Sequence, residues 1–237
     1  MRNPYKRFRR TSNKISAKSL TRKQKESGRQ GENNVAYILS QLPPSYIVFN
    51  NVLLKQGKMK LPYMYGQQHV GRKVVKNGTA YEVVQKTTQI DHVVVSPFGI
   101  FVIETKNHSG IIFGDANGSC WTQVLAGINK RVTFTNPIIQ NMGHIRALSR
   151  MLNIPPNYMA GIVVFANEKA SLANVAHLCC NLETLPYAIA RYNTPIWNMQ
   201  ETMYIAQTIQ ALNSSSKYND AKHVKYVNKL KTFHGGV

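Results

Sequence analysis

The sequence QIDHVVVSPFGIFVIETKN, residues 89–107, predicts a strongly apolar β-hairpin that carries two carboxylates and a lysine. Val93–Val95 and Ile100–Ile103 are β-branched or aromatic runs, as strands favour. Pro97 and Gly99 mark the turn between them. The acidic and basic side chains therefore lie within the most apolar strand pair of the sequence.

The length of the turn sets which side chains meet. A two-residue loop pairs Ser96 with Gly99, and counting back from that pair puts Asp91 opposite Glu104. Because strand side chains alternate between faces, Lys106 shares the face of Glu104. A three-residue loop with a bulge would shift the register by one residue and bring His92, rather than Asp91, onto the Glu104 face. The first register is favoured.

Opposed carboxylates need a physical reason. Like charges directly across a strand pair repel each other, and ionised carboxylates in apolar surroundings are expected only when paired or bound to metal. Acids are also scarce here, with 10 Asp plus Glu against 30 Lys plus Arg. A divalent cation between Asp91 and Glu104 removes the objection, and such hard oxygen ligands suit Mg²⁺ or Mn²⁺.

Composition bounds the class of protein. The 237 residues suffice for one sizeable α/β domain with extensions, and no run approaches the roughly 20 apolar residues of a membrane span. The three cysteines form no disulfide framework, and adjacent Cys179 and Cys180 are expected in the core. We expect a reducing, cytoplasmic compartment and no membrane partner. The formal charge of +20 favours polyanions, of which nucleic acid is the usual one.

Basic segments surround the predicted core. Residues 1–27 are expected to form a flexible basic N-terminal arm, residues 28–213 the folded domain, and residues 214–237 a basic C-terminal tail. Residues 55–86 form a basic insertion, a hairpin or loop excursion that interleaves lysines and arginines with tyrosines. That composition suits phosphate contact and base stacking, although an exposed hairpin without such a role explains it equally well.

The remaining elements follow from periodicity and from breaker residues. Helical spacing is present in 31–42, 138–152 and 200–212, and apolar strand runs in 46–54, 110–114, 161–166 and 179–182. Trp121 is expected to continue the sheet, and Pro137 suits the first position of its helix. The order of elements predicts an α/β sandwich with a mixed sheet.

Three motifs together resemble the NERD (nuclease-related domain) family, within the PD-(D/E)XK nuclease superfamily. They are Gly31-Glu32, the hairpin of residues 89–107, and NPIIQ at residues 136–140 followed by His144. The resemblance covers about residues 28–150. It implies a restriction-endonuclease-like α/β core, with a central mixed β-sheet flanked by helices and basic extensions added to it.

The resemblance also implies a site. Its first-helix glutamate, strand aspartate and E-x-K element correspond to Glu32, Asp91, Glu104 and Lys106. Asp91 and Glu104 would ligate Mg²⁺ or Mn²⁺, with Glu32 as a further ligand, directly or through water. The backbone carbonyl of Thr105 is a further ligand by analogy with the superfamily.

Other polar residues of the motifs have two interpretations each. Gln140 and His144 lie four apart and project from one helix face, where they either contact the substrate phosphate or water, or form the polar edge of a packing helix. His92 is expected on the opposite face of the sheet as a core histidine bonded to backbone. Asp115, near two glycines, is most simply a turn residue.

The function expected from these features is a metal-dependent nuclease that hydrolyses phosphodiester bonds, with DNA favoured over RNA. The alternative is a non-catalytic nucleic-acid-binding module that retains the nuclease fold. The carboxylate–lysine set favours the enzyme, because binding alone gains nothing from acids placed beside phosphates. The oligomeric state stays open; a dimer would suit cutting of both strands.

Overall fold

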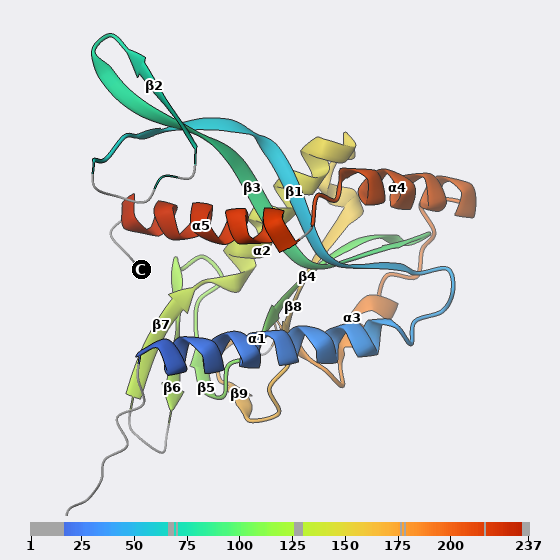
Figure 1. Ribbon diagram of the computed structural model, residues 1–237. Helices are drawn as coiled ribbons and strands as arrows, with labels where there is room; N and C mark the ends of the chain where they lie inside the picture. The colour runs from blue at the N-terminus through green and yellow to red at the C-terminus, as the bar shows by residue number, and fades with distance from the viewer. Residues whose placement is uncertain are drawn as a thin grey trace, which may run out of the picture.

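The computed structural model describes residues 17–65, 69, 71–125, 130–175, 177, 179–215 and 217–233. Two β-sheets and their flanking helices make up the chain (Figure 1). The elements in order are α1 (Ala17–Leu39), β1 (Ile47–Pro62), β2 (Arg72–Lys76), β3 (Thr79–Ser96), β4 (Gly99–Lys106), β5 (Gly110–Phe113), β6 (Cys120–Leu125), β7 (Lys130–Thr135), α2 (Pro137–Leu152), the 3₁₀ helix η2 (Pro156–Tyr158), β8 (Met159–Phe165), β9 (Ala170–Leu172), β10 (Cys180–Asn181), α3 (Leu185–Ala190), α4 (Met199–Leu212) and α5 (Lys217–Phe233).

The larger sheet is mixed, as expected. Its order is β1-β3-β4-β8-β10, with β2 added beside the distal part of β3. β1, β3 and β4 pair antiparallel, whereas β4 pairs parallel with β8. Ser96 pairs with Gly99, which confirms the two-residue loop; the alternative three-residue loop is wrong. Gly99 has a φ of 133°, a conformation that favours glycine at the end of so tight a turn.

Helices cover both faces of the larger sheet. The core on one face joins β1, β3 and β4 to Leu148 of α2 and Ile209 of α4. The core on the other face joins β4 and β8 to Leu39 of α1 and Leu185 of α3. β4 is buried from Gly99 to Thr105 because both of its faces are covered, which explains its continuous apolar run. This layering is that of the expected restriction-endonuclease-like α/β fold.

The second sheet corrects one expectation. Trp121 does not continue the main sheet but lies in β6 of a separate four-stranded sheet with the order β7-β6-β5-β9. Its indole is fully buried and stacks on Phe165 of β8, with ring centroids 6.3 Å apart. The strand propensity around Trp121 was sufficient to predict a strand but not its partner, because pairing depends on distant residues.

Helix α2 begins where the sequence predicts. Asn136 caps it by accepting hydrogen bonds from the N–H groups of Ile138 and Ile139, and Pro137 occupies the first turn. The Asn136 amide also donates to three carbonyls of the β5–β6 connection, those of Asp115, Ala116 and Gly118. One side chain therefore fixes both the start of α2 and its place beside the second sheet.

The chain termini differ from expectation. α1 begins at Ala17 rather than near Gly31, so residues 17–27 of the expected N-terminal arm are helical; residues 1–16 lie outside the described residues. The expected C-terminal tail contains helix α5. The basic insertion is a three-stranded antiparallel excursion, in which the first half of β3 pairs with the C-terminal part of β1 on one side and with β2 on the other. Of the helices described, none is long and apolar enough to cross a bilayer.

Candidate active site

The candidate site forms where β3 separates from β4. Their last paired residues are His92 and Ile103. In an uninterrupted ladder, the next hydrogen-bonded pair after His92 and Ile103 would be Ile90 and Thr105. Here the carboxylate of Asp91 takes the place of the Ile90 backbone. Its Oδ2 accepts the N–H of Thr105 at 2.8 Å. The aspartate is therefore held at the opening between the strands by the backbone of the E-x-K strand itself.

A kink in β1 and β3 causes the separation. Ile90 and Val93 lie three residues apart yet bury their side chains in the same core, so the alternation of faces is interrupted between them. On β1 the same holds for Phe49 and Val52. Asn51 between them has a φ of 55°, in the left-handed region that asparagine tolerates better than most residues.

The segment before α5 supports this kink. Asn51 Oδ1 accepts a hydrogen bond from Gln89, and its Nδ2 donates to Ser215 Oγ at 2.8 Å and to Asp220 Oδ2 at 3.3 Å. Asn213 adds a further bond, since its Oδ1 accepts the N–H of Leu53. The C-terminal region is thus part of the structure that positions Asp91.

Glu104 and Lys106 lie on the α2 face of β4, as their two-residue spacing predicts. The Lys106 ammonium lies 2.5 Å from Glu104 Oε1 and donates to Gln140 Oε1 at 3.1 Å. His144 Nε2 lies 3.2 Å from Glu104 Oε2, and the imidazole is fixed from behind by Thr88 Oγ1, 2.8 Å from Nδ1. The sequence allowed two roles for Gln140 and His144. Both side chains project into the candidate site, where Gln140 contacts Lys106 and His144 contacts Glu104.

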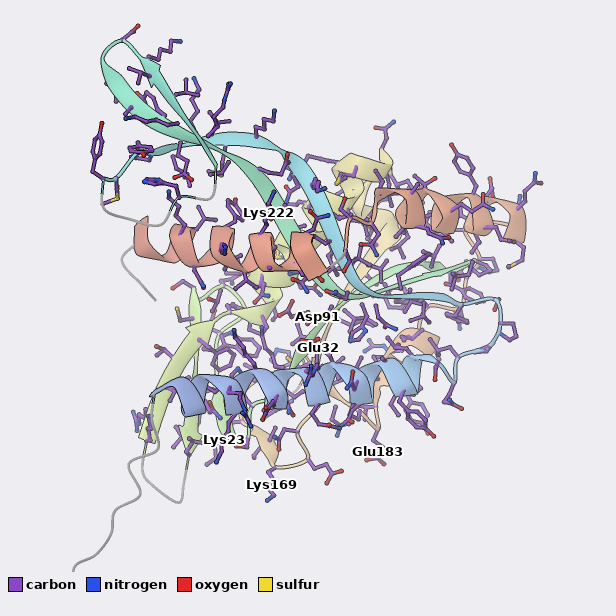
Figure 2. All side chains as sticks on the ribbon, viewed as in Figure 1. Lys23, Glu32, Asp91, Lys169, Glu183 and Lys222 are labelled. Atoms are coloured by element: carbon purple, nitrogen blue, oxygen red, sulfur yellow. The ribbon has the colours of Figure 1, made fainter. Side chains whose placement is uncertain are left out.

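Glu32 approaches from the other side of the sheet on α1. Gly31 lets the helix come close to the end of β4, because a Cβ at Gly31 would lie 2.8 Å from Asn107 Cβ. Asn107 in turn donates to the carbonyl oxygen of Ser27 at 2.6 Å. Figure 2 shows Glu32 directed from α1 toward the region of Asp91. The structure therefore brings Glu32, Asp91, Glu104, Lys106 and Gln140 together.

The carboxylates influence one another electrostatically. Burial and the Glu104 charge raise the pKa of Asp91 well above its usual value. The same two causes raise the pKa of Glu32. Burial also acts to raise the pKa of Glu104, but Lys106 and His144 outweigh it, so that pKa lies below its ordinary value. The surroundings of Glu104 therefore favour its charged form, whereas burial and the neighbouring charge disfavour the charged forms of Asp91 and Glu32.

This donor set suits a hard divalent cation. In the described part of the chain, no three His, Cys, Asp or Glu side chains form a ready-made metal cage. Mg²⁺ usually takes one or two carboxylates, with waters and substrate phosphate completing its coordination. The Thr105 carbonyl is a further oxygen: N–H and C=O of one strand residue point to the same side, and the Thr105 N–H points to Asp91. A cation here would relieve the repulsion that raises the pKa of Asp91.

Residues expected outside the site lie outside it. His92 is buried on the opposite face, where its Nδ1 lies 2.7 Å from Asn50 Oδ1, so its partner is a side chain rather than backbone. Burial lowers the pKa of His92 to about 4. Asp115 closes a turn by accepting the N–H groups of Asn117 and Gly118. Cys179 and Cys180 pack in the core.

Sequence reasoning missed Thr88 and Asn107. Thr88 precedes Asp91 by three residues, but only the kink turns its hydroxyl toward His144. Asn107 directly follows the E-x-K element, and its contact with α1 depends on the close approach at Gly31. Neither the type of these two residues nor their spacing from the motifs would have indicated their partners.

The sequence model of one family, the nuclease-related domain, matches residues 27–166. The chain is also similar to the uncharacterized protein pXO1-01 of Bacillus anthracis. The two are 32% identical over 211 residues, which cover 86% of this chain and 84% of the relative. No solved structure matches.

Proposed function

Because the chain belongs to the nuclease-related domain (NERD) family, placed within the PD-(D/E)XK nuclease superfamily, we propose that it is a metal-dependent nuclease that hydrolyses phosphodiester bonds in DNA. The observation that carries this proposal is the geometry around Glu104. The buried Glu104 carboxylate lies 2.5 Å from the Lys106 ammonium, beside a second carboxylate, Asp91, whose pKa is raised by burial and then by the charge of Glu104. Such an arrangement is costly unless a cation and a phosphate complete it.

Asp91 and Glu104 would hold Mg²⁺ or Mn²⁺, with the Thr105 carbonyl as a third oxygen and Glu32 as a direct or water-mediated ligand. The bound cation would supply an acidified water and polarise the scissile phosphate. His144, fixed by Thr88, keeps the Glu104 carboxylate in one orientation. This is how an outer residue tunes a metal ligand.

Lys106 would stabilise the charge that develops on the phosphate or position the attacking water. Gln140 accepts from its ammonium and so keeps the group directed into the site rather than into solvent. The ammonium's other contact is Glu104, so a phosphate that arrives at the site meets a cation already oriented toward it. The side chains of Lys106 and Gln140 are only half-buried, which leaves the site open to a polymer substrate.

The alternative is a nucleic-acid-binding module without turnover. DNA is preferred as the substrate on the chain's excess of basic residues and its nuclease-related family. The test uses wild-type protein with supercoiled plasmid, single-stranded DNA and single-stranded RNA, each with Mg²⁺, Mn²⁺ or EDTA. We expect cleavage of DNA with either cation and none with EDTA. Binding without cleavage in every metal condition would favour the binding module, and cleavage of RNA alone would overturn the choice of DNA.

A further inference from the structure

The basic insertion has two chemically different faces. We define the β-extension as residues 57–62 of β1, β2, and residues 79–86 of β3; Figure 1 shows it projecting beyond the body of the main sheet. Met59 and Leu61 of β1 and Val84 of β3 pack against Tyr226, Val227 and Leu230 of α5. α5 therefore covers the β1 and β3 part of one face, called here the inner face; Lys73 and Val75 of β2 lie on the same face and are exposed.

A buried ion pair joins the inner face to α5. Glu82 is fully buried and contacts Lys229 of α5, His69 at 3.1 Å and the N–H of Gly71 at 2.5 Å. The acid of the β-extension is thus satisfied internally and contributes no negative charge at its surface. Together, the apolar contacts and this pair make α5 and the β-extension one unit.

The outer face is cationic. Strand alternation and the observed register place Lys58 and Lys60 of β1 on the same face as Arg72 and Lys76 of β2, opposite to Glu82 and Val84. All four side chains are exposed. Lys60 and Arg72 flank the same β3 residue, Val83. Among the described residues of the β-extension, Glu82 is the one acid, and it is buried on the inner face.

This face suits phosphates better than bases. Its aromatic residue, Tyr81, is half-buried beneath Lys60, whose ammonium lies 5.9 Å from the ring centroid. The exposed Tyr65 instead belongs to a cluster with Tyr63 and Lys73. Lys73 lies opposite Glu82 in the β2–β3 register, so this cluster lies on the inner face. Single-strand binders offer free aromatic platforms to bases, whereas duplex binding without sequence preference depends on phosphate contacts.

The outer face also lies at a useful distance from the candidate site. Val83 precedes Asp91 by eight residues on the same strand, a separation of at most about 27 Å at about 3.4 Å per residue. One turn of B-DNA spans about 34 Å. α5 bridges the interval, since its His223 lies 2.8 Å from Thr87, beside the Thr88 that holds His144.

We propose that the outer face of the β-extension, formed by Lys58, Lys60, Arg72 and Lys76, binds the phosphate backbone of duplex DNA within one helical turn of the candidate site. This binding does not depend on the DNA sequence, and it does not require cleavage of the DNA. The inference deepens the proposed function by assigning its substrate form and its anchoring surface.

The test measures binding of the full chain to a fluorescent duplex in EDTA, from 50 to 200 mM salt. The duplex has about 30 base pairs, or about three helical turns, so that it spans both the candidate site and the outer face. The outer-face variant carries Lys58→Gln, Lys60→Gln, Arg72→Gln and Lys76→Gln. The matched control, Lys130→Gln, Arg131→Gln, Lys169→Gln and Arg191→Gln, removes equal charge from exposed positions elsewhere. Four lost phosphate contacts lower the slope of log affinity against log salt by about 3.6. Wild-type affinity should therefore fall about a hundredfold more over this range than that of the outer-face variant.

The control should keep the wild-type slope. An unchanged slope in the outer-face variant, an equal fall in the control, or absence of duplex binding by the wild type would overturn the inference. Tighter binding of single-stranded DNA of the same sequence, with the same loss of slope, would overturn the duplex assignment. Because EDTA prevents metal-dependent cleavage, a protein that binds through this face but never cleaves would contradict the proposed function alone. Cleavage with an unchanged slope would contradict this inference alone.

Discussion

Asp91 is the residue at which stability and the proposed function conflict. Its carboxylate takes the place of a strand partner by accepting the N–H of Thr105, but the residue is half-buried and lies close to the charge of Glu104. The pKa of Asp91 is raised by burial first and by the Glu104 charge second. In the absence of metal, folding therefore shifts the protonation equilibrium of this side chain toward its neutral form.

A neutral substitute should stabilise the metal-free protein. Since the folded pKa of Asp91 is raised, its contribution to stability is present below the unfolded pKa of about 3.9 and is lost as the pH rises through the folded pKa. Asp91→Asn escapes that loss, and its amide oxygen can still accept the Thr105 N–H. Thermal unfolding in EDTA should show equal stability near pH 4 and a gain of about 1–2 kcal/mol for the variant at pH 8.

Metal should reverse the order of the two proteins. Mg²⁺ or Mn²⁺ in excess should stabilise the wild type and leave Asp91→Asn nearly unchanged. A variant less stable than the wild type at pH 8 in EDTA would contradict the electrostatic account of Asp91.

The sequence predicts the placement of individual site residues well where that placement depends on local rules. The alternation of β4 places Glu104 and Lys106 together, and the two-residue turn sets the register as far as the His92–Ile103 pair. Asp91, expected directly opposite Glu104, lies just beyond that last pair. The sequence does not predict that Asn51 kinks the strand pair, because a left-handed asparagine has no signature beyond its residue type. Asn51 accepts a hydrogen bond from Gln89 and donates to Ser215 and Asp220, and these partners of the kink lie in distant parts of the chain.

At the scale of elements, the placement of α1 determines whether Glu32 reaches the site. The helix has two glycines near that residue with contrasting surroundings. A Cβ at Gly31 would lie within 2.8 Å of Asn107, whereas one at Gly28 would meet nothing within 4 Å. The pair therefore offers a matched test of whether close helix–strand approach matters.

Gly31→Ala should displace α1 from the end of β4 and reduce nuclease activity at least tenfold. Gly28→Ala should keep full activity and gain up to about 1 kcal/mol of stability from helix propensity alone. Cleavage rates and urea unfolding of both variants provide the measurement. Equal activities of the two variants would show that the position of Glu32 is not set by contact at Gly31.

The junction of α5 with the β-extension depends on the Glu82–Lys229 pair. Glu82→Leu alone leaves the Lys229 ammonium buried without this carboxylate and should cost about 3–5 kcal/mol. Glu82→Leu combined with Lys229→Leu should lose less than half as much, since no buried charge remains. Urea unfolding of the single and double variants gives both values, and equal losses would mean that the pair does not join the two elements.

For the whole molecule, short-range patterns predicted the α/β class and most of the helices and strands around the site. The partner of Trp121 and the helical state of the C-terminal region were not predicted, because both depend on tertiary contacts. α5 has few apolar residues, and its Tyr226, Val227 and Leu230 find partners in residues far away in sequence. The N-terminal part of α1 has no apolar stripe before Val35 and was missed for the same reason.

The most direct test of the proposed site is the rate of supercoiled-plasmid nicking in Mg²⁺ by three proteins: wild type, Glu104→Gln and Glu183→Gln. Both substitutions remove one negative charge, but Glu104 is buried beside Lys106 while Glu183 is exposed away from Asp91 and Glu32 (Figure 2). We expect Glu104→Gln to lose nicking by at least a hundredfold and still bind the plasmid, whereas Glu183→Gln should nick at the wild-type rate. Equal nicking by Glu104→Gln and the wild type would contradict the proposed site.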